Sequence, residues 1–576
     1  MKQNLKRLLG YAGAYKFSII MALVCAFFAS AGVVLATYLN GVAIDQIAGP
    51  GNVNFKGLIL VLTSLGVIYL LSSLFQWFIS RYANKVSYMV VRDMRRETFS
   101  NLNDQPLSYY DHHPHGDLIS RFTNDLDSVS DAMAVSITNL FSGAVTVLTA
   151  LAFMLYLNIW ITLAILLVTP ICLLVAYYIT KYSQKAFQKQ QQSVGELSSF
   201  VSEIVGNQKI VKAFNREQRS EEQFGEISEG LRKTGTKAMF GSALVNPSTR
   251  FVNNISYIVV GVVGGIVCIT QGVSVGILSS FLIYSAQFAK PFNEISGITA
   301  QIQTAFASLD RIFSLIDAKP QQPDPQDAVE LTDCQGNIRF DNVYFSYDKN
   351  KPLIRGLSFE AHHGEMIAIV GPTGCGKTTL VNLLMRFYDI DAGKISIDGI
   401  DIMKITRDSL RKSFGMVLQD TWLFAGTIRD NIAYGRPGAT EAEVLAAAKA
   451  AHAHSFIKRL PNGYNTVVSD DGGELSQGQR QLLTIARAML ADPEMLILDE
   501  ATSSIDTLTE IRIQKAFLKL MEGRTSFVIA HRLSTITSAD LILVMDKGNI
   551  IEQGTHHQLL SRGGFYTNLY NSQFAG

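Results

Sequence analysis

The sequence predicts a membrane all-α domain with six helices, fused to a water-facing α/β domain. Three observations support this fold class. The first 300 residues contain long runs without a charged residue, three prolines cluster near residue 320, and short strand-like runs alternate with helical stretches after that point. The composition agrees, because 48% of the 576 residues are hydrophobic and only 17% are charged.

Six segments are apolar over about the 20 residues that a helix needs to cross a bilayer. They lie near residues 17–38, 57–80, 136–157, 159–180, 250–270 and 274–298. A buried helix of a soluble protein would carry charges on its outer face, whereas these runs are apolar all round. We therefore interpret them as membrane spans.

Positive charges indicate which side of the membrane the connecting segments face, because Lys and Arg are retained in the cytoplasm. Residues 81–130 contain six of them, whereas the loop 39–56 has only Lys56. Both termini of this multi-pass cell-membrane protein are therefore expected to be cytoplasmic. The long segments after the second and fourth spans show helical periodicity, which predicts rigid stalks below the membrane.

A proline-rich stretch separates the two parts of the chain. Pro320, Pro323 and Pro325 mark a linker. We expect a transmembrane domain over 1–318, a linker over 319–336 and the α/β domain over 337–576. A net charge of +1 gives no basic surface for nucleic acid, and the five scattered cysteines lack the spacing of a metal site or a disulfide framework.

A glycine-rich loop follows the apolar strand 366–370 and precedes a helix. It reads Gly371-Pro372-Thr373-Gly374-Cys375-Gly376-Lys377-Thr378-Thr379. This fits GxxxxGK[ST] in the strand-loop-helix context that makes the motif specific. Backbone N–H groups of such a loop surround the phosphates, Lys377 supplies positive charge, and the Thr378 hydroxyl can bind Mg²⁺. The sequence therefore predicts a site for ATP and Mg²⁺.

A second apolar strand, 495–498, ends in Asp499-Glu500. Two carboxylates at a strand terminus lie where a parallel sheet opens its ligand crevice. Asp499 suits the Mg²⁺ shell. Glu500 is placed to polarise an attacking water, because hydrolysis needs a positioned nucleophile and a proton acceptor.

The stretch Leu475-Ser476-Gln477-Gly478-Gln479 resembles the signature motif of ATP-binding cassette (ABC) proteins. The resemblance covers essentially the whole chain and implies the type I ABC exporter fold. It also implies roles for single residues: Tyr347 looks like the aromatic that stacks on adenine, Gln419 like the glutamine that contacts magnesium and senses the γ-phosphate, Asp506 lies in the D-loop, and His531 matches the switch histidine. The expected site thus has catalytic residues Lys377, Glu500 and His531, metal ligands Thr378, Gln419 and Asp499, and nucleotide contacts from Tyr347, Gly371 to Thr379, Gln419, Ser476, Gly478, Gln479, Asp499 and Asp506.

The same resemblance implies a dimer. In this family the signature serine and glycine reach the γ-phosphate held by the other subunit, so Ser476 and Gly478 would complete the partner's site. Residues 108–125 resemble the first intracellular loop, whose short coupling helix presses on the ATP-binding domains, and residues 213–217 resemble the second.

One stretch departs from the family pattern. Members often carry Gly-Glu-Arg-Gly before the signature, whereas this chain reads Ser469-Asp470-Asp471-Gly472, so a basic position has become acidic. This resembles one half of the heterodimeric exporters, in which the two ATP sites are unequal. We expect a heterodimer with a second half-transporter, and a homodimer is the alternative.

The expected function is ATP-driven export of hydrophobic or amphipathic small molecules, including drugs, by alternating access. The spans contain no charge to pair with an ionic substrate, which is consistent with an apolar pathway. The same scaffold supports lipid flipping or peptide export. An ATP-gated channel or a sensor is a further alternative, but Glu500 favours ATP turnover.

Overall fold

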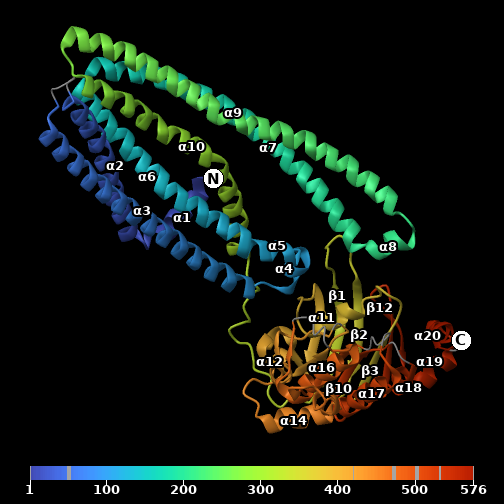
Figure 1. Cartoon of the computed structure of the whole chain (residues 1–576). Coiled ribbons are helices and arrows are strands. Elements are labelled where there is room, and N and C mark those ends of the chain that lie inside the picture. Colours follow the sequence, from blue (N-terminus) through green and yellow to red (C-terminus); the bar gives the residue numbers. More distant parts are fainter. Residues whose placement is uncertain are drawn as a thin grey trace. The chain divides into compact units, whose positions relative to one another are not determined.

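The computed structural model describes residues 2–47, 53–419, 421–469, 475–499, 505–530 and 533–574 (Figure 1). The chain divides into two compact units. Unit 1 comprises Met1–Gln105 and His113–Lys319, and unit 2 comprises Pro106–His112 and Pro320–Gly576.

The described part of unit 1 is mainly helical, and each predicted span coincides, to within one residue, with part of one of six long helices. The elements are α1 (Lys2–Gly13), α2 (Lys16–Asp45), α3 (Phe55–Asn103), α5 (His115–Ser120), the π-helix η1 (Arg121–Asp125), α6 (Leu126–Leu157), α7 (Ile159–Gly206), α8 (Gln208–Ala213), α9 (Glu217–Gln271) and α10 (Val275–Ile316). Within the described residues, four helical stretches are long and apolar enough to cross a membrane: Lys16–Asp45, Phe55–Asn103, His115–Leu157 and Asn253–Gln271. A shorter apolar stretch, Ile159–Ile171, begins α7.

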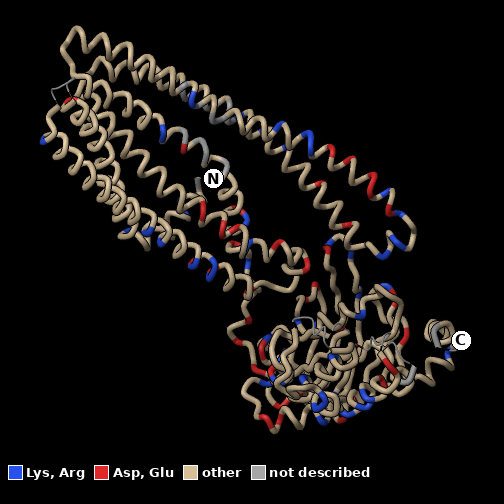
Figure 2. Tube along the Cα trace, in the orientation of Figure 1, with Lys and Arg blue, Asp and Glu red and all other residues tan. Residues whose placement is uncertain are grey.

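Helices α7 and α9 continue well beyond their apolar halves. Figure 2 shows their charged residues gathered toward α8, at the end of the pair. The apolar half of each helix is free of charge over residues 159–180 and 251–271. The two helices therefore extend from a span into a polar stalk, as the helical periodicity predicted.

Unit 2 contains helix α4 (Leu107–His112) together with the α/β domain. A four-stranded antiparallel sheet has the order β2-β1-β4-β5, and a six-stranded sheet has the order β12-β11-β3-β10-β9-β6. The strands are β1 (Ile338–Phe345), β2 (Ile354–Ala361), β3 (Met366–Val370), β4 (Ala392–Ile397), β5 (Ile400–Asp401), β6 (Phe414–Val417), β9 (Met495–Asp499), β10 (Thr525–Ile529), β11 (Leu541–Asp546) and β12 (Asn549–Gly554), with β7 (Gly426–Thr427) and β8 (Val467–Val468) forming a separate pair. The helices of the domain are α11 (Lys377–Leu384), α12 (Arg407–Lys412), α13 (Ile428–Ala433), α14 (Glu441–Ala450), α15 (His454–Ile457), α16 (Gln477–Ala491), α17 (Thr507–Met521), α18 (Leu533–Thr537), α19 (His556–Arg562) and α20 (Phe565–Phe574).

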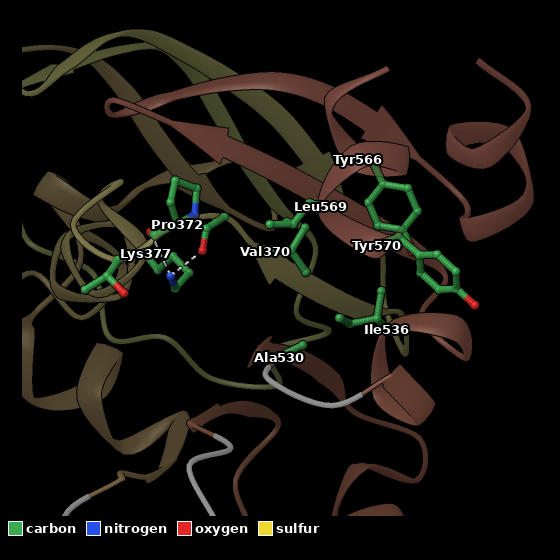
Figure 3. A pocket seen from close by; sticks show the side chains of 10 residues that line it. Val370, Pro372, Lys377, Ala530, Ile536, Tyr566, Leu569 and Tyr570 are labelled. Carbon is green, nitrogen blue, oxygen red and sulfur yellow. Dashed lines mark hydrogen bonds between the residues drawn. The ribbon is translucent and has the colours of Figure 1, made fainter. Parts of the chain in front are cut away.

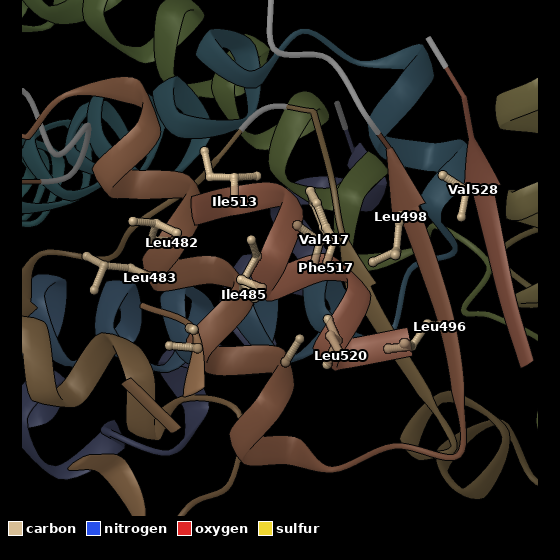
Figure 4. Close-up of a cluster of buried hydrophobic side chains, with 14 of the residues drawn as sticks. Val417, Leu482, Leu483, Ile485, Leu496, Leu498, Ile513, Phe517, Leu520 and Val528 are labelled. Carbon is tan, nitrogen blue, oxygen red and sulfur yellow. The ribbon is translucent and has the colours of Figure 1, made fainter. Parts of the chain in front are cut away.

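The central strands are buried on both faces because they alternate between two hydrophobic clusters. In β9, Leu496 and Leu498 belong to one cluster, whereas Met495 and Ile497 belong to the other. Figure 4 shows the first cluster, where side chains of α16 and α17 pack against β6, β9 and β10. Apolar runs of this kind are typical of parallel strands covered on both sides. The packing fixes α16, which carries the signature residues at its start.

The proline-rich segment is bound to the α/β domain by ion pairs. Asp324 accepts hydrogen bonds from the backbone N–H of Arg407 at 2.9 Å and from its guanidinium at 2.7 Å. The guanidinium of Arg386 lies 3.5 Å from the same carboxylate, and both arginine side chains are less than 10% exposed. The backbone of Val329 then donates a hydrogen bond to the carbonyl oxygen of Lys404 and accepts one from the N–H of Thr406. This segment is therefore an integral part of unit 2 from Asp324 onward.

Candidate functional site

The loop between β3 and α11 adopts a conformation that its glycines make possible. Gly371, Gly374 and Gly376 have φ of 156°, 80° and 106°. A Cβ at Gly371 would lie 2.3 Å from the carbonyl oxygen of Met545 and 2.7 Å from Sγ of Cys375. The residue at position 371 must therefore have no side chain. The backbone N–H groups of the loop lie at the start of α11, where the helix dipole favours an anion. The residues present fit a bound phosphate chain.

Lys377 is the cation of this loop. Its Nζ donates to the carbonyl oxygens of Gly371 at 2.8 Å and Pro372 at 3.1 Å, so the ammonium lies across the mouth of the loop. Phosphate oxygens are stronger acceptors than these carbonyls because they are charged. Thr378 and Thr379 follow on the first turn of α11, and burial raises the pKa of the Cys375 thiol, which keeps it protonated.

The order of strands in the six-stranded sheet places Asp499, at the end of β9, at the same edge of the sheet as the phosphate loop. Strand β10 pairs in parallel with both β3 and β9, so Asp499 ends a strand two positions from the phosphate loop, about 10 Å away. Gln419 follows β6, which is the other neighbour of β9, and is exposed. Glu500 and His531 lie outside the described residues. The order places Lys377, Asp499 and Gln419 at the carboxyl edge of one sheet, where ligands bind in such folds.

An aromatic group next to the loop contains the predicted adenine-stacking residue. Tyr347 is 46% exposed, and its hydroxyl donates to Oγ1 of Thr379 at 3.3 Å. Its ring meets that of Tyr388 edge-on, with centroids 5.0 Å apart, and Phe345 completes the group. An exposed ring with fixed orientation can stack on a base.

Tyr388 also binds helix α4. Its hydroxyl donates to the carboxylate of Asp111, a residue of the short helix that resembles the coupling helix. Burial raises the pKa of Tyr388, and the bond to Asp111 raises it further, so the phenol remains a donor. The contacts thus run from Asp111 through Tyr388 and Tyr347 to Thr379 of the phosphate loop.

The predicted signature residues lie at the start of α16. Ser476 is the N-cap: its side chain accepts from the backbone N–H of Gln479 at 3.3 Å, and the Gln479 side chain accepts from the N–H of Ser476 at 3.0 Å. A Cβ at Gly478 would lie 2.4 Å from Cγ2 of Thr509 in α17. Asp506 caps α17 by accepting from Thr509 N–H at 2.9 Å, and this bond lowers its pKa.

The structure does not bring the signature to the chain's own phosphate loop. Within the described residues, the side-chain hydrogen bonds of Ser476 and Gln479 are only those of their reciprocal cap. This is the arrangement that a site completed by a partner would have.

The C-terminal helix lies on another side of the loop. A pocket of about 120 Å³ is lined by residues of both. In Figure 3, Leu569 of α20 points toward Val370, and Tyr566 and Tyr570 of the same helix lie on the side away from Lys377. Tyr566 is buried, which raises its pKa to about 12, and its hydroxyl bonds Nδ1 of His556 at 2.7 Å. Helix α20 therefore lines a pocket that the start of the phosphate loop also lines.

Comparisons with known proteins agree with this geometry. The ABC transporter transmembrane region model matches residues 19–292, and the ABC transporter model matches residues 354–503. The "Fatty acid ABC transporter ATP-binding/permease protein" of Mycobacterium tuberculosis is 43% identical over 531 residues, covering 92% of this chain and 83% of the relative. The chain belongs to the ABC exporters.

Two further members of the family extend the comparison. The "ATP-dependent lipid A-core flippase" of Syntrophus aciditrophicus is 37% identical over 573 residues, covering 99% of this chain and 94% of that protein. The solved structure of a bacterial Atm1-family ABC exporter with ATP bound aligns with a TM-score of 0.77 at 30% identity, covering 97% of this chain and 99% of that one. The predicted fold class of this ABC exporter is confirmed, as is an ATP hydrolase coupled to transport.

Two functional features of this ABC exporter were absent from the sequence prediction. Tyr388 follows Phe387 with no motif around it, and its link to Asp111 joins residues 277 positions apart. The place of α20 beside the loop is equally non-local. The family resemblance pointed to Tyr347, but nothing in the sequence indicated that its ring meets that of Tyr388.

Proposed function

We propose that this ABC exporter moves amphiphiles that carry an acyl chain, such as long-chain fatty acids or lipids, out of the cytoplasmic leaflet. The observation that carries the proposal is that two relatives aligned over nearly the whole chain are named for fatty acid and for lipid A-core. Hydrophobic or amphipathic small molecules, including drugs, remain the broader class from which this cargo is drawn.

The membrane part supports the same cargo. Residues 132–180 and 251–289 contain no charged side chain, so these spans give an apolar path to an acyl chain and no ion-pair partner to a headgroup. An acyl chain needs no such partner, because its transfer into an apolar environment is favourable. The headgroup would then travel along the few polar side chains of the spans.

Each residue of the site has a separate role in ATP binding or hydrolysis. The phosphate loop and Lys377 hold and neutralise the phosphates, Tyr347 orients the base, and Ser476 with Gly478 presents the start of α16 to the partner's nucleotide. Bound ATP supplies the free energy that favours one state of the dimer over the other. Glu500 would activate water, and Thr378, Gln419 and Asp499 would hold Mg²⁺.

ABC exporters work as dimers in a membrane, and we propose that this chain pairs with a different half-transporter. The acidic Asp470-Asp471 pair in place of a basic residue supports an unequal partner. This chain would then contribute its own Lys377, Glu500 and His531, and any degenerate position would lie in the partner.

The test is ATP hydrolysis by the purified chain, alone and with candidate partner halves, in vesicles containing palmitate or a control drug. Stimulation by palmitate and loss of activity in Glu500→Gln would support the proposal. Activity of the chain alone that Glu500→Gln abolishes would contradict the heterodimer. Stimulation by drugs but not by palmitate or phospholipid would contradict the acyl cargo.

A further inference from the structure

An apolar cavity of about 300 Å³ lies in unit 1 where α1 approaches α2, α6 and α10. Of its sixteen lining residues, Ser136 alone is polar. An apolar cavity of roughly half this volume is enough to stay dry and bind a molecule the size of benzene. The cavity is open to the surface, because Leu5 and Leu9 in its wall are 43% and 61% exposed.

Polar contacts on the other face of α1 hold the helix in place over this cavity. The Arg7 guanidinium forms two hydrogen bonds to Asp317, at 2.6 and 2.9 Å, and lies 4.0 Å from the ring centre of Phe313. Tyr11 donates to Glu97 at 2.6 Å, and Asn4 donates to Asp310. These bonds tie α1 to α3 and α10, so it cannot collapse onto α6 to fill the space.

The cavity borders the ends of two spans that the pattern of positive charges predicts to be cytoplasmic. Its walls include residues 129–141 of α6 and 302–309 of α10, which border the cytoplasmic ends of the predicted spans 136–157 and 274–298. The apolar residues of α1 at positions 5, 8, 9 and 12 face it, as expected of a helix that lies in the membrane interface.

The N-terminal segment has no acidic residue of its own, and the acids bonded to α1, namely Glu97, Asp310 and Asp317, come from α3 and the end of α10. No Asp or Glu precedes Asp45, whereas Lys6 and Lys16 are exposed on either side of the cavity wall formed by Leu8 and Leu9. A basic amphipathic helix of this kind attracts the anionic lipids of the cytoplasmic leaflet.

We propose that this cavity is a binding site for one acyl chain of an anionic phospholipid of the cytoplasmic leaflet, whose headgroup lies against the basic residues of α1 and the start of α2. The lipid is resident and not transported. The site therefore stands whether or not fatty acids and lipids are the cargo.

The experiment uses the full-length exporter in vesicles of phosphatidylcholine that contain phosphatidylglycerol with a photoreactive group in one acyl chain. We expect cross-links to residues 129–141 and 302–309. Native mass spectrometry should also show one retained phosphatidylglycerol per chain. Ala305→Phe, which fills the cavity from a position only 6% exposed, should lower retention by about tenfold.

The control is Leu148→Phe, which enlarges a 66%-exposed residue of α6 outside the cavity and should leave retention unchanged. Ser136→Leu is a milder filling variant, in case Ala305→Phe does not fold. In wild type, the absence of cross-links at this site would overturn the proposal. So would cross-linking by a photoreactive fatty acid in place of the phospholipid, or a disulfide from Leu9→Cys to a second copy, which would show that protein covers the cavity. Equal retention of phosphatidylcholine would overturn the anionic assignment.

Discussion

Among the single side chains of the site, Lys377 has the simplest surroundings. Among the residues that the structure describes, its ammonium bonds the carbonyls of Gly371 and Pro372 alone, so its removal leaves no buried charge among them. We expect Lys377→Ala to lower ATP turnover by about 100-fold or more, because a preorganised donor to the phosphates is lost. The melting temperature should hardly change. ATPase assays and thermal unfolding of the purified protein measure the two effects, with exposed Lys349→Ala as the control.

Tyr388 offers a second test at the same scale. Tyr388→Phe removes the hydroxyl that donates to Asp111 but keeps the ring against Tyr347. We expect the KM for ATP to stay within about twofold, since a ring of the same shape is retained. The stimulation of ATPase by cargo should fall, because the bond between α4 and the aromatic group is lost. Tyr388→Ala removes both and should also raise the KM. Unchanged stimulation in Tyr388→Phe would contradict a coupling role for this bond.

These residues also show where sequence reasoning ends. The phosphate loop was predictable because its chemistry depends on consecutive residues, from Gly371 to Thr379. The bond between Tyr388 and Asp111 was not, because it joins two distant segments through tertiary packing. A tyrosine near the end of a helix carries no local signal of such a contact.

At the scale of elements, the start of α16 depends on its packing against α17. Gly478→Ala would place a Cβ 2.4 Å from Cγ2 of Thr509, so one of the helices must shift. We expect a loss of about 1–3 kcal/mol of stability together with lost turnover. Denaturant unfolding of the full chain measures the first effect.

The double variant Gly478→Ala with Thr509→Ser separates packing from chemistry. The serine lacks the offending methyl group and keeps the backbone N–H that Asp506 caps. Restored stability without restored turnover would show that the glycine is also needed for the partner's nucleotide. Recovery of both would assign it to packing alone.

The proline-rich segment is the second element with a clear prediction. Asp324→Ala removes the carboxylate from the buried guanidinium of Arg407 and weakens the surroundings of Arg386. The expected loss is about 2–3 kcal/mol, because a charge-assisted bond is broken while the arginines stay buried. Thermal unfolding should show it, and Asp327→Ala, an exposed acid in the same segment, should behave as wild type.

For the molecule as a whole, sequence periodicity predicted the order of the helices and strands but not the residues at which the long helices begin and end. The six apolar runs all became helices, but α3, α7, α9 and α10 extend far beyond the residues that suit a membrane. Charged residues with helical periodicity follow the run in α3, α7 and α10 and precede it in α9. The π-helix η1 had no signal. It ends at Asp125, whose buried carboxylate accepts hydrogen bonds from Arg311 and Ser308 of α10, a contact set by tertiary packing. Burial alone would raise the pKa of Asp125, but these hydrogen bonds outweigh that effect and lower it.

The anchored linker has a consequence for how strong the coupling contacts must be. Asp317 is bound by Arg7 in one unit and Asp324 by Arg407 in the other, so the seven-residue step between them spans at most about 25 Å. A short tether of this kind keeps the effective concentration of one unit near the other in the millimolar range. Contacts that break and re-form during the ATPase cycle can then be individually weak, because the tether alone limits how far the two units can separate.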